Sequence, residues 1–383
     1  IEKRMLEIIE ENNPVQREVW DKQEVIKYFG NIGNRFKPEI LERVQDGKIS
    51  VYRQTLKNGE SFIDMCVGPH VTSTGKISKA FKLTKLAGAY WRGDENNKML
   101  TRVYGLAFTT KADLEQEIWR QEEAVKRDHR KLGKELDLFV FSELVGPGMP
   151  LFTPKGTIVR NGIANYSREL NKKIGFSEVH TPNINKAELF KISGHYDKYK
   201  DDMLQVKSHY SDEEYYLKPM NCPQHTQIYA SQMRSYKDLP LRYADFANLY
   251  RDERPGELSG LTRLRCFSQD DGHCFCREDQ IEQEFAHVLG VIKEALTTYN
   301  LNYWIRLSLR DPKQKEKYLG DDATWNKAEA TLRKLLEENK IDFVAAEGEA
   351  AFYGPKMDIM AKDSIGREWQ ISTIQLDLNM PVR

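Results

Sequence analysis

The sequence lacks the features of a membrane-spanning or disulfide-built secreted protein. Its 383 residues contain no apolar run near the roughly 20 residues that cross a bilayer, and the first residues have no signal-peptide profile. Five cysteines, an odd number in a long chain, argue against a disulfide framework and for a reducing, cytoplasmic compartment. Charge of one sign is not in excess, because 58 lysines and arginines balance 58 aspartates and glutamates. A nucleic-acid partner would therefore need a local basic face.

What is present describes a globular protein with more than one core. Hydrophobic residues make up 40% of the chain and charged residues 30%. A chain of 383 residues can bury two or more cores, so we expect at least two domains. The chain starts at Ile1 and stops at Arg383, just after an apparent strand. We expect it to be an internal piece of a longer protein.

The pattern divides the chain into three parts. Residues 1–110 begin with an amphipathic helix and continue with two extended runs joined by Asn58-Gly59, a strong hairpin turn. Residues 111–136 carry an apolar stripe among charged residues and predict a solvated linker helix. In residues 137–383 strand pairs dominate and strict βαβ alternation is scarce. This favours an α+β fold, an antiparallel sheet flanked by helices.

Apolar periodicity predicts the individual elements of the larger domain. Because helices repeat at about 3.6 residues and strands at 2, the two kinds of segment can be told apart. Helices are expected at residues 157–173, 278–300 and 323–338, and strands at residues 176–181, 241–250, 261–275, 303–310, 342–346, 356–361 and 367–376.

A strand, a charged loop and a second strand between Leu241 and Phe275 carry the first chemical signal. Arg251, Glu253 and Arg263 surround the turn. Arginine suits a phosphate or carboxylate site because its planar fork pairs with either group bidentately. Charged hairpin tips are usually only solvated, and this is the plainer interpretation. An Arg-x-Glu facing an Arg-x-Arg, followed by Gln-Asp-Asp-x-His in the same unit, favours a site.

The same stretch resembles a known family. YRDERPGELSGLTRLRCFSQDDGHCF is similar to motif 2 of class II aminoacyl-tRNA synthetases, and most similar to that of the threonyl-tRNA synthetases. The resemblance extends over nearly the whole chain in the family's order. Further matching segments are DMCVGPH at Asp64–His70, GAYWRGD at Gly88–Asp94, KPMNCPQH at Lys218–His225, AFYGPK at Ala351–Lys356 and QISTIQLD at Gln370–Asp377.

The resemblance implies that threonine and ATP form threonyl-adenylate, and that threonine then passes to the 3′ end of tRNA(Thr). Arg251 would hold the α-phosphate and the substrate carboxylate, Glu253 would contact adenine, Arg263 would contact the γ-phosphate and Phe267 would stack on the base. Lys356 completes the expected catalytic residues. With Mg²⁺ bound, positioning and charge neutralisation carry most of the rate, and no covalent nucleophile is needed.

A zinc site for the amino acid is implied by the same resemblance. By local chemistry alone, Cys222 is better explained as a buried structural cysteine and His273 as a surface histidine. In the family the matching positions bind zinc, with a third histidine expected beyond Arg383, and Asp271 resembles the carboxylate that accepts a hydrogen bond from the threonine hydroxyl. The rest of the substrate pocket would be formed by Met220, Gln269, Tyr353, Gln370, Thr373 and Gln375.

An editing half-site is implied in residues 1–110. Asp64, Cys66 and His70 match the family's domain that hydrolyses serine mischarged onto tRNA. Without the resemblance, a structural cysteine and a loop histidine would be the better interpretation. The family's HxxxH partner lies upstream and is absent here, so this half-site is expected to be incompetent alone.

Assembly and alternatives complete the expectations. The helix at 157–173 and the strand at 176–181, which closes at Pro182, resemble motif 1 and imply a homodimer, although an ordinary helix–strand unit fits the same residues. Motif 3 is expected beyond Arg383. Another class II synthetase, seryl or prolyl, and a non-catalytic binding paralogue stay open as alternatives. Cys222 with Asp271-x-His273 favours a threonine enzyme over a seryl or prolyl one. The presence of Arg251 and Glu253 disfavours a binding paralogue.

Overall fold

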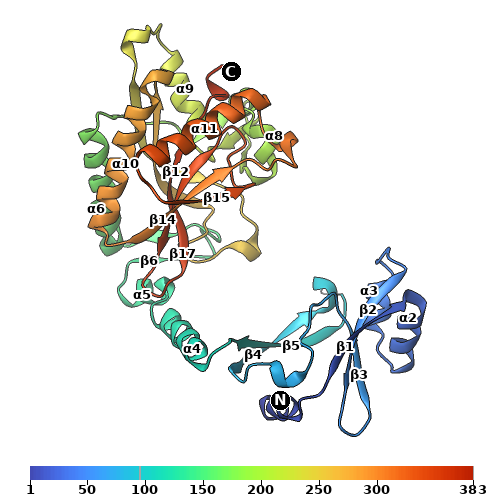
Figure 1. Cartoon of the computed structure of the whole chain (residues 1–383). Helices are drawn as coiled ribbons and strands as arrows, with labels where there is room; N and C mark the ends of the chain where they lie inside the picture. Colours follow the sequence, from blue (N-terminus) through green and yellow to red (C-terminus); the bar gives the residue numbers. More distant parts are fainter. Residues whose placement is uncertain (95, 383) are drawn as a thin grey trace. The chain divides into compact units, whose positions relative to one another are not determined.

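The computed structural model describes residues 1–94 and 96–382 and divides into two compact units (Figure 1). The first unit is Ile1–Glu123 and the second is Ala124–Arg383. The structure confirms the α+β class, since both units combine helices with largely antiparallel sheets. No helix in the described part of the chain is long and apolar enough to cross a membrane.

The first unit is built on a three-stranded antiparallel sheet in the order β1-β2-β3, with a separate hairpin of β4 and β5. The predicted turn is present, and Gly59 adopts a φ of 85° between β2 and β3. A small core of buried side chains, among them Val25, Phe29 and Val51, lies between the helices and this sheet. The elements are α1 (Glu2–Glu11), β1 (Val15–Asp21), α2 (Lys22–Asn31), α3 (Phe36–Leu41), β2 (Lys48–Thr55), β3 (Ser61–Met65), β4 (Phe81–Tyr90) and β5 (Met99–Ala107).

The predicted linker helix is two helices, α4 (Lys111–Lys126) and α5 (His129–Glu135). The chain breaks because Asp128 caps α5. Its backbone is extended, at φ −60° and ψ 122°, and its carboxylate accepts a hydrogen bond of 2.8 Å from the backbone N–H of Arg130. The boundary between the two compact units falls inside α4, after Glu123.

The second unit contains the remaining elements. Its helices are α6 (Pro154–Lys173), α7 (Ala187–Ile192), α8 (His195–Tyr199), α9 (Cys222–Ala230), α10 (Ile281–Thr298) and α11 (Asp322–Glu338). Its strands are β6 (Phe139–Val140), β7 (Leu151–Phe152), β8 (Ser177–Glu178), β9 (Ile184–Lys186), β10 (Gln205–Val206), β11 (Tyr215–Leu217), β12 (Leu241–Tyr250), β13 (Cys266–Phe275), β14 (Asn302–Leu309), β15 (Phe343–Glu347), β16 (Lys356–Lys362) and β17 (Glu368–Gln375).

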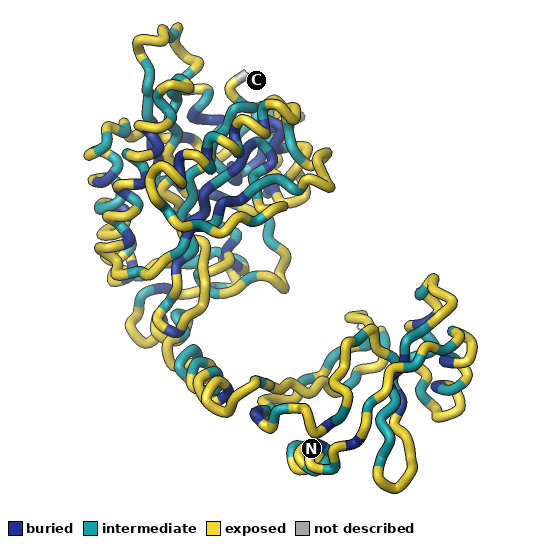
Figure 2. Tube along the Cα trace, viewed as in Figure 1, coloured by how far each residue is buried: buried dark blue, intermediate teal, exposed yellow. Residues whose placement is uncertain are grey.

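Two sheets position the site. In one, β13 pairs antiparallel with β12, and β8 joins β12 in parallel; in the other, the order is β15-β14-β16-β17, with only β15 parallel to its neighbour. Helices α10 and α11 cover one face of the second sheet, where a core that includes Leu289, Leu307 and Met357 is buried (Figure 2). Strand alternation then leaves the other face for polar residues.

Candidate active site

One face of β13 collects four of the predicted site residues. Phe267, Gln269, Asp271 and His273 occur at every second position of this strand, so their side chains share a face. Their partners across the ladder are Leu249, Ala247, Asp245 and Tyr243. The second strand of the hairpin was predicted from residue 261, but it begins at Cys266, because residues 251–265 form a loop closed by a short bridge between Ser259 and Arg263.

The loop between β12 and β13 brings the predicted ATP residues together in two groups. The Arg251 guanidinium lies 5.1 Å from the centre of the Phe267 ring, and no carboxylate in the described part of the chain pairs with it. Arg263 instead donates to the Glu253 carboxylate at 2.8 Å and lies 3.3 Å from Glu257. Arg251 is therefore a cation of this loop that is free to bind an anion.

A buried lysine anchors the segment before α9. Lys218 is 1% exposed, and its ammonium donates to the hydroxyl of Thr181 at 2.6 Å, with the Asp245 carboxylate at 3.8 Å. Three residues later, the backbone N–H of Asn221 donates to Asp271 at 3.3 Å. These contacts hold Met220 and Cys222, which flank Asn221, over the face of β13.

Cys222 and His273 have the donor chemistry of a zinc site, but they do not complete one. The chain's thiol and imidazole are soft donors that zinc prefers, yet no group of three or more His, Cys, Asp or Glu side chains among the described residues is arranged to hold a metal. Burial, reinforced by Asp271 and Asp377, raises the pKa of the Cys222 thiol well above its usual value. The Nδ1 atom of His273 lies 2.8 Å from Nδ1 of His225, so one proton is shared between these two rings.

The predicted residues of β16 and β17 meet around an aspartate that sequence reasoning missed. Lys356 donates to Asp358 at 2.6 Å, and the amide nitrogen of Gln370 donates to the same carboxylate at 3.0 Å. Tyr353 donates its hydroxyl to the side chain of Gln375. The signal for Asp358 was its place two residues after Lys356, on the same face of a strand.

Tyr353 is electrostatically coupled to groups of both parts of the site. Burial raises the pKa of the Tyr353 phenol well above its usual value, and Cys222, Asp377 and Asp271 raise it further. The side chain of Tyr353 thus lies within electrostatic reach of both the β13 face and the loop after β17.

Some buried polar atoms of the second unit lack hydrogen-bond partners. Among the described residues, five buried side-chain atoms have no hydrogen-bond partner, and four of them belong to His195, Asn221, His225 and Thr373. Buried polar groups are nearly always satisfied in folded proteins, so these atoms are candidates for contact with a polar ligand. His195 was not predicted. It follows Gly194 at the start of α8, its Nδ1 lies 2.8 Å from the Ser193 hydroxyl, and its ring packs edge-on against Phe352.

The predicted editing residues lie together in the first unit. His70 stacks on Tyr52 with ring centres 3.9 Å apart, and Tyr52 faces Asp64 across the β2–β3 ladder. Asp64 pairs with Lys37. Cys66 is exposed, and the N–H of Gly68 donates to its sulfur at 3.4 Å. Any side chain at Gly68 would overlap the Tyr52 hydroxyl, so the loop requires glycine there.

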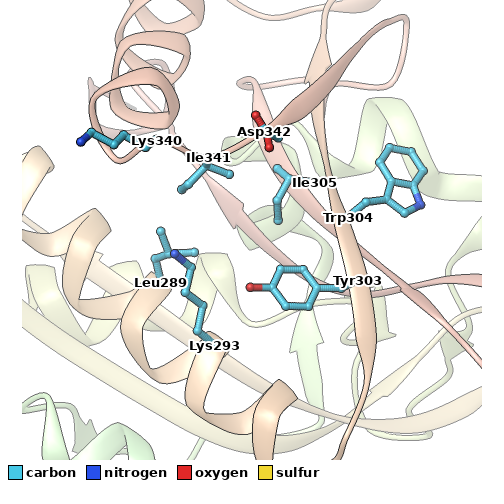
Figure 3. A pocket seen from close by; sticks show the side chains of 8 residues that line it. All are labelled: Leu289, Lys293, Tyr303, Trp304, Ile305, Lys340, Ile341 and Asp342. Atoms are coloured by element: carbon cyan, nitrogen blue, oxygen red, sulfur yellow. The ribbon is translucent and has the colours of Figure 1, made fainter.

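A separate hollow of about 260 Å³ lies on the helix-covered side of the second sheet (Figure 3). None of the predicted site residues belongs to it. It is lined by Leu289, Lys293, Tyr303, Trp304, Ile305, Lys340, Ile341 and Asp342.

Family models match the two units separately. Residues 204–383 match the tRNA synthetase class II core domain (G, H, P, S and T), and residues 49–104 match the threonyl and alanyl tRNA synthetase second additional domain. The β12–β13 hairpin with its loop arginine and the matched core model define a class II aminoacyl-tRNA synthetase core.

Curated relatives and solved structures narrow this class. The chain is 46% identical to the threonine–tRNA ligase of Cytophaga hutchinsonii and 48% identical to that of Rubrobacter xylanophilus, over 385 residues that cover 100% of this chain and 59% of each relative. It is similar to the solved RNA binding domain of threonyl-tRNA synthetase from Cryptosporidium parvum Iowa II, with a TM-score of 0.64 and 39% identity over 67% of this chain and 62% of that one. A putative threonyl-tRNA synthetase from Aeropyrum pernix gives a TM-score of 0.59 and 33% identity over 65% and 60%. The chain belongs to the threonyl-tRNA synthetase family.

Proposed function

We propose that this chain carries the adenylate-forming centre of a threonine–tRNA ligase, which activates threonine with ATP and transfers it to the 3′ end of tRNA(Thr). The chain spans 59% of the length of the curated relatives that it matches. The observation that supports the proposal best is the unpaired Arg251 guanidinium over the Phe267 ring. Phe267 lies near the start of β13, and the strand face that carries it also carries Gln269, Asp271 and His273.

In the activation step, a carboxylate oxygen of threonine attacks the α-phosphorus of ATP, and pyrophosphate leaves. The adenine ring stacks on Phe267, and Arg251 binds the α-phosphate. A preorganised cation at this position stabilises the charge that accumulates on the pentavalent phosphorus. Mg²⁺ bound with ATP would neutralise the charge of the β- and γ-phosphates. Arg263 and Glu253 would have to separate for their predicted contacts with the γ-phosphate and adenine.

Amino-acid selection is proposed to use zinc on Cys222 and His273, with a third ligand that residues 1–383 do not supply. The metal would bind the amino group and the hydroxyl of threonine. This addresses a real selectivity problem, because hydrophobic packing separates an added hydroxyl from its isostere only by roughly a hundredfold. In this chain, His225 holds the Nδ1 side of His273 and leaves its other ring nitrogen for a ligand.

Editing, assembly and location follow as parts of the same proposal. Asp64, Cys66 and His70 would belong to a centre that hydrolyses serine mischarged onto tRNA. A homodimer through α6 is supported by apolar side chains that the chain leaves in water, since Ile158 is 74% exposed and Ile163 is 49% exposed. A cytoplasmic location is supported by five cysteines that are all free.

The test is amino-acid-dependent exchange of pyrophosphate into ATP, by residues 1–383 and by any longer product of the same gene. Threonine, valine, serine and proline are compared, with and without a zinc chelator. For the longer product, exchange with threonine that chelation abolishes, and none with valine, is expected. Exchange with serine or proline would overturn the proposed threonine specificity but would still fit a class II synthetase. No exchange with any amino acid by a zinc-loaded longer product would favour a binding paralogue.

A further inference from the structure

Asp358 is the most heavily hydrogen-bonded carboxylate on the polar face of the second sheet. Its side chain is fully buried, with 0% exposure. It accepts hydrogen bonds from Lys356 at 2.6 Å, Ser308 at 2.7 Å, Arg306 at 2.9 Å and Gln370 at 3.0 Å. Three strands, β14, β16 and β17, thus meet at one carboxylate.

The strand registers explain this convergence. Arg306 of β14 and Thr373 of β17 stand opposite Asp358, on either side of β16. The residues between them in each strand, such as Leu307 and Met357, point into the core on the other face. The polar face therefore presents two cations and one buried anion side by side, and the hydroxyl of Thr373 beside them is buried without a hydrogen-bond partner.

The charges around Asp358 balance only while it is ionised. Arg306 also pairs with Glu349 at 3.2 Å, and that carboxylate is 49% exposed. Removing the negative charge of Asp358 would leave Lys356 and Arg306 as two neighbouring cations without the carboxylate between them. A buried charge whose partner is removed is strongly unfavourable, so Lys356 would move away from this position.

The hydrogen bonds hold the Gln370 amide fully but leave donors of the Lys356 ammonium free. Gln370 is held at both ends, because its amide nitrogen donates to Asp358 and its oxygen accepts from Arg306 at 3.1 Å. Lys356 has three N–H donors, and the bond to Asp358 uses one of them. Its side chain is 12% exposed, so the ammonium still reaches the open side of the sheet.

We infer that Asp358 is a positioning residue for adenylate formation: it fixes Lys356, so that the two remaining N–H donors point at the anionic substrate, and it holds Gln370 as support. This rests on the proposed function. The family resemblance places Gln370 in the substrate pocket. Here it has a supporting role instead, because its amide is bonded to Asp358 and Arg306 within the protein.

The decisive experiment measures whether Asp358 acts through Lys356. Asp358→Asn, Lys356→Met and the double variant are compared by threonine-dependent pyrophosphate exchange. Loss of an oriented charge at a reacting phosphate costs about a hundredfold to a thousandfold in rate, and we expect a loss of that size in kcat rather than in the KM for ATP. The double variant should be no worse than the worse single variant. Multiplying losses would overturn the inference.

A second readout does not depend on activity. Acylation of Lys356 by an N-hydroxysuccinimide ester at pH 8 is followed by mass spectrometry, in the unmutated chain and in Asp358→Asn. The Asp358 carboxylate holds the amine by a hydrogen bond in a position that is only 12% exposed, so loss of the carboxylate should release Lys356 and speed labelling several-fold. Unchanged labelling would contradict the inference even if the chain catalyses nothing. Absent exchange with a normal labelling shift would contradict only the proposed function.

Two further variants guard against trivial outcomes. If Asp358→Asn does not fold, Arg306→Gln takes its place. Without the Arg306 guanidinium, Lys356 is, among the described residues, the one remaining cation that donates to Asp358, so labelling of Lys356 should slow. Faster labelling would count against the inference. Asp363→Asn is the matched control, because Asp363 also pairs with an arginine, Arg367 at 2.7 Å, but at the turn after β16. It should change neither exchange nor labelling.

Discussion

Individual buried histidines set the acid sensitivity of the second unit. His195 is fully buried, and desolvation lowers its pKa from 6.5 to about 4. Protonation would place a charge beside Phe352, on a ring whose Nε2 has no partner. A residue that is kept neutral in this way ties folding to pH.

We predict that the second unit loses stability as the pH falls from 6.5 towards 4. In this window the unfolded chain binds a proton at His195 and the folded chain does not, so acid favours unfolding. The contribution is fully present above pH 6.5, and a shift from 6.5 to about 4 amounts to about 3 kcal/mol. Urea unfolding at pH 7.0 and 4.5 measures it. His195→Gln should lose less stability between these values, and an equal loss in both chains would contradict the prediction.

Arg251 provides the sharpest residue-scale test of the site. Arg251→Gln keeps a hydrogen-bonding side chain but removes the cation, and we predict that exchange with threonine falls by about a hundredfold to a thousandfold. Arg254→Gln, an exposed arginine of the same loop, is the control and should change exchange by less than about threefold. Equal losses in both variants would mean that the loop contributes only general positive charge.

Helices and strands were predictable where neighbouring residues alone determine them. The bounds of β12 are those predicted, Leu241–Tyr250, because a continuous apolar and aromatic run ends at a charged loop. The alternation of Phe267, Gln269, Asp271 and His273 on one strand face is also inherent in the sequence. The identities of the site residues came from the family resemblance, and their roles stay predictions.

The elements that were not predicted depend on contacts between distant residues. The break between α4 and α5 follows from the capping carboxylate of Asp128, which an apolar stripe does not reveal. The role of Asp358 depends on Arg306 and Gln370, which lie 52 and 12 positions away in the chain. Periodicity carries no information about such pairs, so neither Asp358 nor His195 could be identified.

Helix α5 contacts the loop between β12 and β13. Nε2 of His129, the first residue of α5, accepts a hydrogen bond of 2.8 Å from the N–H of Leu261. Gly260, with φ of 48°, leaves room for this ring, since a side chain there would overlap it. The helix thus fixes the loop that carries Arg251 and Arg263.

We predict that His129→Ala weakens ATP binding without unfolding the chain. One lost hydrogen bond costs about 1 kcal/mol, which corresponds to roughly a fivefold higher dissociation constant. Calorimetric titration with ATP and Mg²⁺ measures it. Lys131→Ala, on the exposed side of the same helix, is the control. An unchanged affinity for ATP in His129→Ala would show that the loop holds its conformation without α5.

At the scale of the whole molecule, the exposed apolar side chains of α6 bear on assembly. Ile158 is 74% exposed, Val159 is 53% exposed and Ile163 is 49% exposed, on a helix that also buries Ala164 and Leu170. A helix with apolar residues on two faces needs a second partner. The buried side chains pack within the second unit, and the exposed ones are available to another copy of the chain.

We predict that residues 1–383 form a dimer whose stability depends on this face. Sedimentation equilibrium between about 0.5 and 50 µM measures the dissociation constant. Ile158→Asp places a charge where an apolar contact is expected, and a central contact is worth on the order of 2 kcal/mol, so the dimer should weaken by roughly 30-fold. Val125→Asp is the control, because Val125 is equally apolar and 71% exposed but lies on α4. If both variants dimerise like the unmutated chain, α6 does not form the interface. A monomer throughout the range would remove the support that these side chains give to a homodimer, while leaving the chemistry proposed for Arg251 and Lys356 untouched, since both belong to one chain.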